Sequence, residues 1–314
     1  MKELRMVKFI LLIFFTLLFK LLFSQQVAHN SQYMHNLIVY NPALAGANSC
    51  GEIGLDVRKQ WLGFPTSPMT ESLFIHGRIK EKHGLGLIIM NDKAGVANSL
   101  GAELAYSFHP IAAQAQRLSL GLSLTVEQYT FVESGFKLRE PADPIVNYGA
   151  SSAIKPDIAF GFYYKANDFN VGLGVRQLLS SMLIMDNVYF LKRHYFLHMG
   201  FEKEVKRTFT IEPTLLIKGT ESAKLSFDFN LKFRYKSNLV TGLSYRYQEG
   251  IVGIIGYDSG KFIICYNYDL VMSKLIRYQT GSHEIFIGYK FCREKKKGNR
   301  TGGKKGAVPC PAYG

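Results

Sequence analysis

Apolar and polar residues alternate along much of the chain, a pattern typical of β-strands with one apolar and one polar face. The clearest case is residues 223–236, where the odd positions from Ala223 to Tyr235 are apolar and the even positions are polar or charged. Residues 118–127 repeat the pattern with four leucines and a valine. Further alternating segments are 100–108, 157–164, 239–247 and 283–291. Several runs last nine to fourteen residues, longer than the roughly five or six residues of an average strand.

Strands of this length predict an all-β fold, a transmembrane antiparallel β-barrel, because a tilted strand needs about 9–11 residues to cross a bilayer. The pattern indicates about fourteen strands, an even number that leaves both chain termini of the barrel in the periplasm. They are expected to start near residues 50, 68, 83, 97, 116, 155, 169, 192, 207, 222, 238, 250, 261 and 282. In such a barrel the apolar faces contact lipid and the polar faces line the lumen. Closure also leaves no strand edge unpaired in the membrane.

The connections between these segments are asymmetric. Every second connection is expected to be short: Lys80–His83, His109–Gln116, Ala166–Asp168, Glu202–Lys206, Lys236–Asn238 and Asp258–Gly260. The intervening connections, at the opposite end of the barrel, include three long ones: 128–154, 179–191 and 270–282. Short periplasmic turns and longer extracellular loops are typical of outer-membrane barrels. The sequence therefore predicts a barrel over residues 50–292.

Residues 1–24 have the pattern of a secretory signal peptide. Three basic residues precede the apolar run Phe9–Phe19, and cleavage is expected after Ser24. An uncleaved anchor helix is the alternative, but Lys20 interrupts the apolar run and leaves it too short. No other apolar stretch reaches the roughly 18 residues of a transmembrane helix. We therefore expect export to the outer membrane.

Composition agrees with this interpretation. Hydrophobic residues make up 47% of the 314 residues and aromatic residues 13%, which excludes a disordered chain. Mean hydropathy is +0.01, because alternating apolar and polar residues cancel in the average. Of the net charge of +14, about three units belong to the signal peptide and about six to the last 22 residues. The barrel itself is only mildly basic, so the charge is no evidence for nucleic-acid binding.

Two segments flank the predicted barrel. Residues 25–49 contain Asn41-Pro42 followed by small residues and Gly46, which is turn chemistry. We expect a periplasmic N-terminal segment or a plug. Residues 293–314 form a basic, glycine-rich tail that contains Cys310 and Pro311. We expect it in the periplasm, either as a solvated charge run or as a partner-binding tail.

Charged residues occupy the polar faces of the predicted strands. Most are interpreted as a polar filling of the lumen in which several side chains pair with one another, and a substrate pathway is the alternative. The predicted luminal charges are Glu103, Glu127, Asp228, Lys232, Arg234, Arg246, Glu284 and Lys290.

No catalytic, metal or cofactor site is predicted. His194 and His198 are four residues apart, which on a strand separates them by about 13 Å, too far to share a metal. Gly84-x-Gly86 and Gly172-x-Gly174 lack the third glycine and the following helix of a nucleotide-binding motif. We therefore predict a protein that is not an enzyme.

The four cysteines allow one disulfide hypothesis. Cys50 precedes the first predicted strand and Cys292 follows the last, so closure of the barrel brings them together. Cys310 lies in the same oxidising compartment, so one pairing among these three is expected. Cys265 falls within a strand and is assigned to packing.

Several motifs along the chain carry a family resemblance. Tyr33-Met34-His35-Asn36 and the run from Tyr40 to Gly46 are similar to the mature N-terminus of the PorP/SprF family of Bacteroidetes outer-membrane proteins. Arg58-Lys59-Gln60-Trp61-Leu62-Gly63-Phe64, followed by Pro68 and Thr70, resembles its R-x-Q-W-x-G-F-x-x-x-P-x-T stretch. The family-motif residues that are candidates for partner binding are Asn41, Pro42, Gly46, Arg58, Gln60, Trp61, Gly63, Pro68, His283, Glu284, Cys310 and Pro311.

The resemblance implies a component of the type IX secretion and gliding-motility system. Its expected role is to bind or anchor the C-terminal domain of a secreted surface adhesin or other cargo. The expected partners are that domain, a peptidoglycan-linked periplasmic type IX component and outer-membrane lipid. The rival interpretation is a porin or a hydrophobic-substrate transporter barrel.

Overall fold

The structure is a computed structural model that describes residues 31–113, 115–132, 150–179, 182–184, 188–206, 208–221, 223–236, 238–247, 249–272 and 279–292. The predicted signal peptide and the basic tail, with Cys310 and Pro311, lie outside the described residues.

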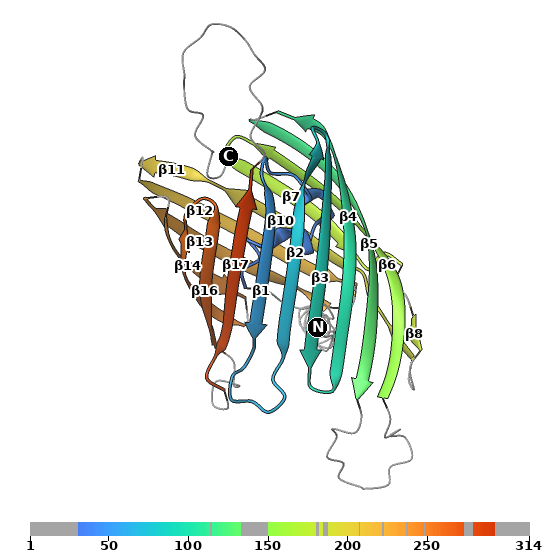
Figure 1. Ribbon diagram of the computed structural model, residues 1–314. Helices are drawn as coiled ribbons and strands as arrows, with labels where there is room; N and C mark the ends of the chain where they lie inside the picture. Colours follow the sequence, from blue (N-terminus) through green and yellow to red (C-terminus); the bar gives the residue numbers. More distant parts are fainter. Residues whose placement is uncertain are drawn as a thin grey trace, which may run out of the picture.

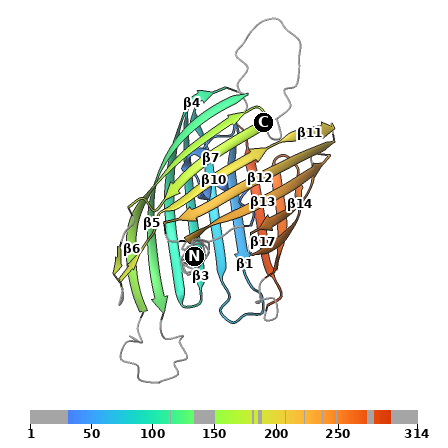
Figure 2. The same cartoon turned by 180° about the vertical axis from the view of Figure 1, so that it is seen from behind.

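Fourteen of the described strands form a closed antiparallel barrel (Figures 1 and 2). Each pairs with its neighbours along the chain, and β1 pairs with β17 to close the sheet. The predicted fold and strand number are confirmed. The barrel strands are β1 (Gly51–Lys59), β2 (Met69–Lys80), β3 (His83–Ala94), β4 (Ala97–Ala112), β5 (Gln116–Val132), β6 (Ala150–Ala166), β7 (Phe169–Arg176), β10 (His194–Phe201), β12 (Phe209–Thr220), β13 (Ala223–Tyr235), β14 (Leu239–Arg246), β15 (Gly250–Asp258), β16 (Phe262–Val271) and β17 (Ser282–Phe291).

Three short strands were not expected from the sequence. β8 (Met182–Ile184) and β9 (Val188–Phe190) form a separate two-stranded sheet between β7 and β10. β11 (Lys203–Lys206) extends the line of β10 beyond Glu202, and it pairs with β12 through an irregular register. The expected turn at 202–206 is therefore largely strand.

The two ends of the barrel differ in their connections. We call the end where β1 begins and β17 ends the turn end, and the opposite end the loop end (Figure 1). At the turn end β2 and β3 are joined by residues 81–82, and β6 and β7 by residues 167–168. At the loop end lie the connection 60–68 and the described residues 279–281 before β17, beside the two-residue connection 95–96. Since short turns of outer-membrane barrels face the periplasm, the loop end faces the cell exterior.

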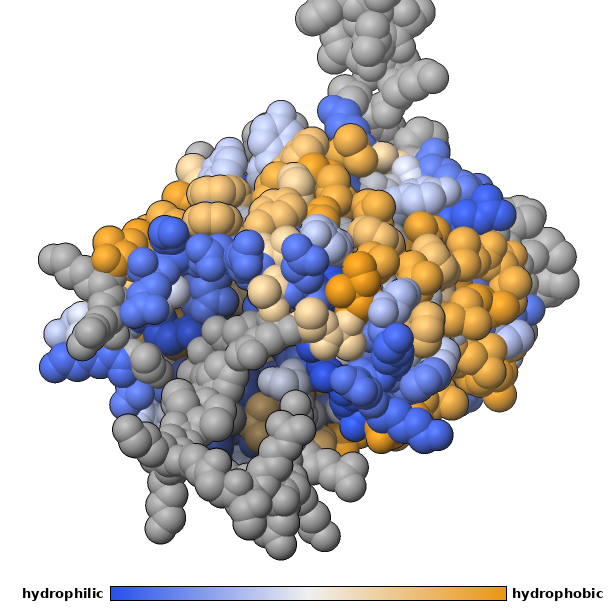
Figure 3. All heavy atoms as spheres, turned by 90° about the horizontal axis from the view of Figure 1, so that it is seen from above, coloured by the Kyte–Doolittle hydropathy of each residue, from blue (hydrophilic) through white to orange (hydrophobic). Residues whose placement is uncertain are grey.

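The outer face of the barrel is apolar. Exposed leucine, isoleucine and aromatic side chains recur at every second position of the strands, and in Figure 3 hydrophobic residues cover much of the flank seen from the turn end. This face is the surface that lipid covers. Representative exposed side chains are Leu104, Leu122, Leu124, Phe160, Leu173, Phe229, Leu243, Ile255 and Leu270. Separately, within the described ranges no helix is long and apolar enough to span a membrane.

Residues 31–49, which we call the luminal segment, lie inside the barrel (Figures 1 and 2). Two short 3-10 helices occur in it, η1 (Leu37–Val39) and η2 (Pro42–Leu44). Most of its side chains are buried, and its apolar residues join one core with inward-facing wall residues of eight strands. Wall residues in this core include Phe74, Ile88, Ala105, Phe196, Leu216, Val240, Ile263 and Phe286.

Candidate functional site: luminal segment and loop-end mouth

The second half of the luminal segment lies in a track of wall glycines. A Cβ atom added to Gly121 on β5 would meet the backbone nitrogen of Ala43 at 2.1 Å, and one added to Gly174 on β7 would meet the carbonyl oxygen of Tyr40 at 2.2 Å. Gly84 on β3 approaches the carbonyl of Ala45 in the same way. No other residue type fits where two backbones lie so close. The glycines of these strands therefore form the seat of the segment.

The Asn-Pro motif fits this track by hydrogen bonding. The Asn41 side chain accepts a hydrogen bond of 3.0 Å from the Ala43 N–H and so caps η2, with Pro42 at the first helical position. Its Nδ2 donates to the Phe162 carbonyl of β6 at 2.9 Å. Gly46 has φ +63°, and a Cβ there would meet the Gly77 carbonyl oxygen at 2.8 Å. The structure thus places Asn41, Pro42 and Gly46 inside the barrel, in contact with its wall.

The first residues of the luminal segment bind a buried cluster of charges near the loop end, which we call the latch: Ser31, Arg58, Arg246, Asp269 and Glu284. The backbone N–H groups of Ser31 and Gln32 donate to Glu284 at 2.7 and 2.6 Å. Ser31 Oγ donates to Asp269 at 2.8 Å and accepts from Arg58 and Arg246.

The charges of the latch also pair across the lumen. Arg58 bridges Asp269 at 2.7 Å and Glu284 at 2.9 Å, and Arg246 bridges Asp269 at 3.1 Å. Because these groups are desolvated, removing one member leaves its partner charge uncompensated. The latch therefore fixes the N-terminal half of the luminal segment at a defined height in the barrel.

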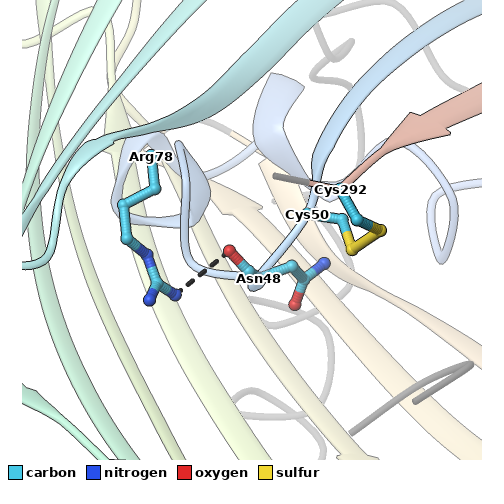
Figure 4. The surroundings of a disulfide bond; sticks show 4 residues. All are labelled: Asn48, Cys50, Arg78 and Cys292. Atoms are coloured by element: carbon cyan, nitrogen blue, oxygen red, sulfur yellow. Dashed lines mark hydrogen bonds between the residues drawn. A yellow bond between two sulfur atoms is a disulfide. The ribbon is translucent and has the colours of Figure 1, made fainter. Parts of the chain in front are cut away.

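At the turn end the segment is held by Arg78 and by a disulfide bond. Arg78 donates to the carbonyls of Gly46, Ala47 and Asn48 at 3.3, 3.4 and 3.1 Å. Figure 4 shows the Asn48 contact beside the disulfide that joins Cys50 to Cys292, with Cα atoms 4.2 Å apart. This bond is one of the pairings the sequence left open, and Cys265 is a buried free thiol. The start of β1 and the end of β17 are thus covalently joined.

At the loop end, residues 60–66 and 279–281 form a surface that we call the platform. The Leu62 N–H donates to Gly281 O, and the Thr280 N–H donates to Leu62 O, both at 2.8 Å. The Trp61 N–H donates to Ser282 Oγ at 3.1 Å, and the Gln60 N–H donates to Pro68 O at 2.9 Å. These bonds fasten the connection between β1 and β2 to the connection before β17.

The platform presents apolar side chains on a constrained backbone. Leu62 and Phe64 are 43% and 46% exposed. Trp61 and Thr66 adopt positive φ angles of 48° and 56°, a conformation that is uncommon for residues with large or branched side chains. Gly63, at φ +94°, has no atom within 4 Å of an added Cβ, so its backbone conformation alone requires glycine. Backbone strain of this kind gathers at binding and catalytic sites.

The remaining predicted residues occupy different places. His283 lies on the outer face of β17 and its Nδ1 bonds to the Tyr266 hydroxyl at 2.6 Å. Arg58 and Glu284 are members of the latch, whereas Gln60, Trp61, Gly63 and Pro68 belong to the platform connection. The family-motif residues are therefore divided between the lumen, the platform and the outer wall.

The predicted luminal charges face inward and most of them pair. Glu103 bridges Arg176 at 2.5 Å, and Arg176 also donates to the Val39 carbonyl of the luminal segment at 2.7 Å. Lys290 lies 3.9 Å from Asp258. Further contacts link Asp228 to Lys218 and Arg246, Glu212 to Lys232 and Arg234, and Glu127 to Ser99 and Tyr129.

A cavity of about 170 Å³ lies between the luminal segment and this charged wall. Met34, Leu37, Ile38 and Leu44 of the segment line one side. The remaining lining is polar and includes charged residues of both signs: Glu52, Lys165, Glu202, Glu212, Lys232 and Lys290. We call this cavity the vestibule. Over the part of the chain that is described, no three His, Cys, Asp or Glu side chains are arranged to hold a metal ion.

Sequence reasoning missed Ser31, Asp269, Leu62, Phe64 and the wall glycines as parts of the site. The glycines did carry a signal, because Gly84, Gly121, Gly161 and Gly174 all fall on inward-facing positions of their strands. Ser31 carried none, since it is an ordinary polar residue far from its partners in the sequence.

The family model for type IX secretion system membrane protein PorP/SprF matches residues 22–289. The chain belongs to the PorP/SprF family. This membership, together with the closed barrel and its apolar outer face, places the protein in the outer membrane as a membrane component of type IX secretion.

Solved structures share the fold of this PorP/SprF protein at low sequence identity. A TodX deltaS2S3 mutant monoaromatic hydrocarbon channel matches with a TM-score of 0.50 and 12% identity, over 81% of this chain and 93% of that one. The CymD monoaromatic hydrocarbon channel matches with a TM-score of 0.48 and 12% identity, over 87% and 95%. The toluene transporter TodX of Pseudomonas putida matches with a TM-score of 0.47 and 11% identity, over 84% of this chain and 94% of that one. A search of curated proteins found no match.

Proposed function

We propose that this barrel binds the C-terminal domain of a secreted adhesin or other type IX cargo at the cell surface, and that the platform is the docking site. The cargo domain would contact the apolar side chains of Leu62 and Phe64 on the exterior side of the membrane. Family membership supports the secretion role, and the geometry of the loop end supports the choice of surface.

The observation that carries this proposal is the ordered, exposed platform. Loops that serve only as connections are usually polar, and they rarely hold large residues at positive φ. Here an apolar, strained loop is fixed by hydrogen bonds to a second loop. A preorganised apolar surface binds a partner with less loss of conformational entropy than a flexible loop does. A permanently exposed apolar surface also favours a protein partner over solvent.

The contents of the barrel argue against its action as an open porin. The luminal segment fills much of the lumen and is held at both ends, by the latch and by Arg78 with the disulfide. A porin needs a continuous aqueous path along its axis. The likeness to hydrocarbon channels concerns the fold alone, and in the described lumen the apolar wall residues pack against the luminal segment. We therefore place the transporter interpretation second.

A second contact is proposed at the turn end, where the peptidoglycan-linked periplasmic component would bind. The support is orientation: the short turns face the periplasm. The basic tail begins immediately after Cys292 at this end of the barrel. No catalytic role is proposed.

The docking proposal is tested by replacing Leu62 and Phe64 together with serine and by recovering the barrel from outer membranes. We expect the wild-type barrel to carry a large secreted protein, identified by mass spectrometry, and the L62S/F64S variant to lose it. Val205→Ser is the matched control, because Val205 is 53% exposed at the turn end. Cargo recovery that is equal in L62S/F64S and V205S would overturn the docking site.

A further inference from the structure

The two halves of the barrel wall have different chemistry. Strands β3 to β7 face the lumen with several glycines, alanines and serines, beside larger side chains such as Glu103, Tyr163 and Arg176, and the second half of the luminal segment rests on them. Strands β12 to β17 carry a larger share of big hydrophilic side chains, beside apolar ones such as Leu216, Ile263 and Phe286. The hydrophilic side chains include Glu212, Lys218, Asp228, Asn230, Lys232, Arg234, Arg246, Asp258, Asn267, Asp269 and Glu284.

The luminal segment meets only part of the hydrogen-bonding capacity of the hydrophilic half of the wall. Asn230 and Asn267 are fully buried, yet neither side-chain amide has a hydrogen-bond partner among the residues that the structure describes. Asn230 pairs across the sheet with Thr214, which bonds to the Tyr33 hydroxyl, and Asn267 pairs with Glu284. Buried amides are nearly always hydrogen-bonded. These two line the wall beside the first half of the luminal segment, where water would satisfy them if that half withdrew.

The two halves of the luminal segment are attached unequally. Residues 41–49 lie in the glycine track, are bonded to Arg78 and lead directly into the disulfide at Cys50. Residues 31–40 have no covalent tie to the wall. Their polar attachments include the latch, the Gln32–Cys265, Tyr33–Thr214 and Asn36–Ser72 hydrogen bonds and the Arg176 contact to Val39. The first half is therefore held by noncovalent contacts alone, including the buried packing of Tyr33, Ile38 and Val39, whereas the second half leads into the disulfide.

We propose that the barrel has a second function as a gated path for small hydrophilic ions and solutes, in which residues 31–40 are the gate and the latch holds it shut. This proposal does not depend on cargo docking. The vestibule is the section of the path that is already open, and withdrawal of residues 31–40 joins it to the loop end. The ionised side chains of β12 to β17 then face water instead of the segment. A path lined in this way favours ions and small polar solutes over hydrocarbons.

The test is the ionic current through the purified full-length barrel in planar lipid bilayers with KCl on both sides. Wild-type protein is expected to be closed for most of the time. Glu284→Ala removes the carboxylate that accepts the Ser31 and Gln32 N–H groups. The open probability should rise by about tenfold to a hundredfold, the range expected when charge-assisted hydrogen bonds are lost. Ser31→Ala, which leaves every wall residue intact, should raise it in the same direction.

Two further variants make the result decisive. Glu127→Ala is the matched control, because this luminal carboxylate bonds to Ser99 and Tyr129 of the wall, and its current should equal that of wild type. In the Glu284→Ala background, Asn36→Cys and Ser72→Cys replace a pair whose Nδ2 and Oγ atoms are 2.8 Å apart, and they should restore the closed state once mass spectrometry shows that the disulfide has formed.

The gate is refuted by any of three results. The first is that Glu284→Ala and Ser31→Ala stay as closed as wild type. The second is that Glu127→Ala opens the barrel as much as they do. The third is that oxidation of the Asn36/Ser72 cysteine pair leaves the current unchanged.

Discussion

Replacing Gly121 with alanine tests whether the luminal segment is seated in the glycine track. The new Cβ would lie 2.1 Å from the Ala43 nitrogen and 2.4 Å from the Pro42 carbonyl carbon. Both are backbone atoms, so no side-chain rotation relieves the clash. Overpacking of this kind typically costs about 1–3 kcal/mol.

Gly253→Ala provides the reference, because no atom lies within 4 Å of a Cβ at this position of β15. Without a clash, replacing glycine by alanine in a strand stabilises by about 0.5–1 kcal/mol. Because this gain is common to both variants, they should differ in free energy of unfolding by the overpacking cost, about 1–3 kcal/mol, with G121A the less stable. Urea unfolding in detergent micelles, followed by tyrosine and tryptophan fluorescence, measures this difference.

The segment can also respond by leaving its seat while the barrel stays folded. Limited chymotrypsin digestion detects that outcome, because Tyr40 is buried in the seated segment and becomes cleavable when the segment is released. Equal stability of G121A and G253A together with equal protection of Tyr40 would refute the seating.

Two further predictions concern the bonds that close the barrel and hold the segment. Replacing both Cys50 and Cys292 with serine opens a covalent loop with a sequence separation of 242. The free energy of unfolding should fall by about 2–5 kcal/mol. Urea midpoints equal to those of the wild type under oxidising conditions would show that the bond adds no stability. Arg176→Ala leaves Glu103 buried without its partner and removes the donor to Val39, so the free energy of unfolding in urea should fall by about 3–5 kcal/mol. The double variant R176M/E103L should recover most of this loss. A double variant as unstable as the single one would contradict the ion-pair explanation.

The fold was predictable because its signal is local and repeats. Alternation of apolar and polar residues located the fourteen barrel strands, and most of the short connections at the turn end followed from the spacing of those segments. Boundaries were less certain where polar residues continue a strand. β6 begins at Ala150, because residues 150–154 still pair with β5 although their side chains do not alternate clearly.

The candidate site was only partly predictable because its contacts join distant residues. Motif residues marked where the site lies, but no pattern linked Ser31 to Glu284, which are 253 positions apart in the sequence. Arg58 and Glu284 acquire a shared role only because β1 and β17 pair in a register that places them opposite each other. The seating of residues 41–46 likewise depends on glycines contributed by separate strands, which become one surface only in the closed barrel.

Site-specific photo-crosslinking in living cells tests the docking of cargo on the platform most directly. A photoreactive amino acid in place of Phe64 should crosslink the barrel to the C-terminal domain of a large secreted protein, identified by mass spectrometry. The same amino acid in place of Val205 at the turn end should not capture that domain. Capture of the cargo domain from position 205 but not from position 64 would contradict the account.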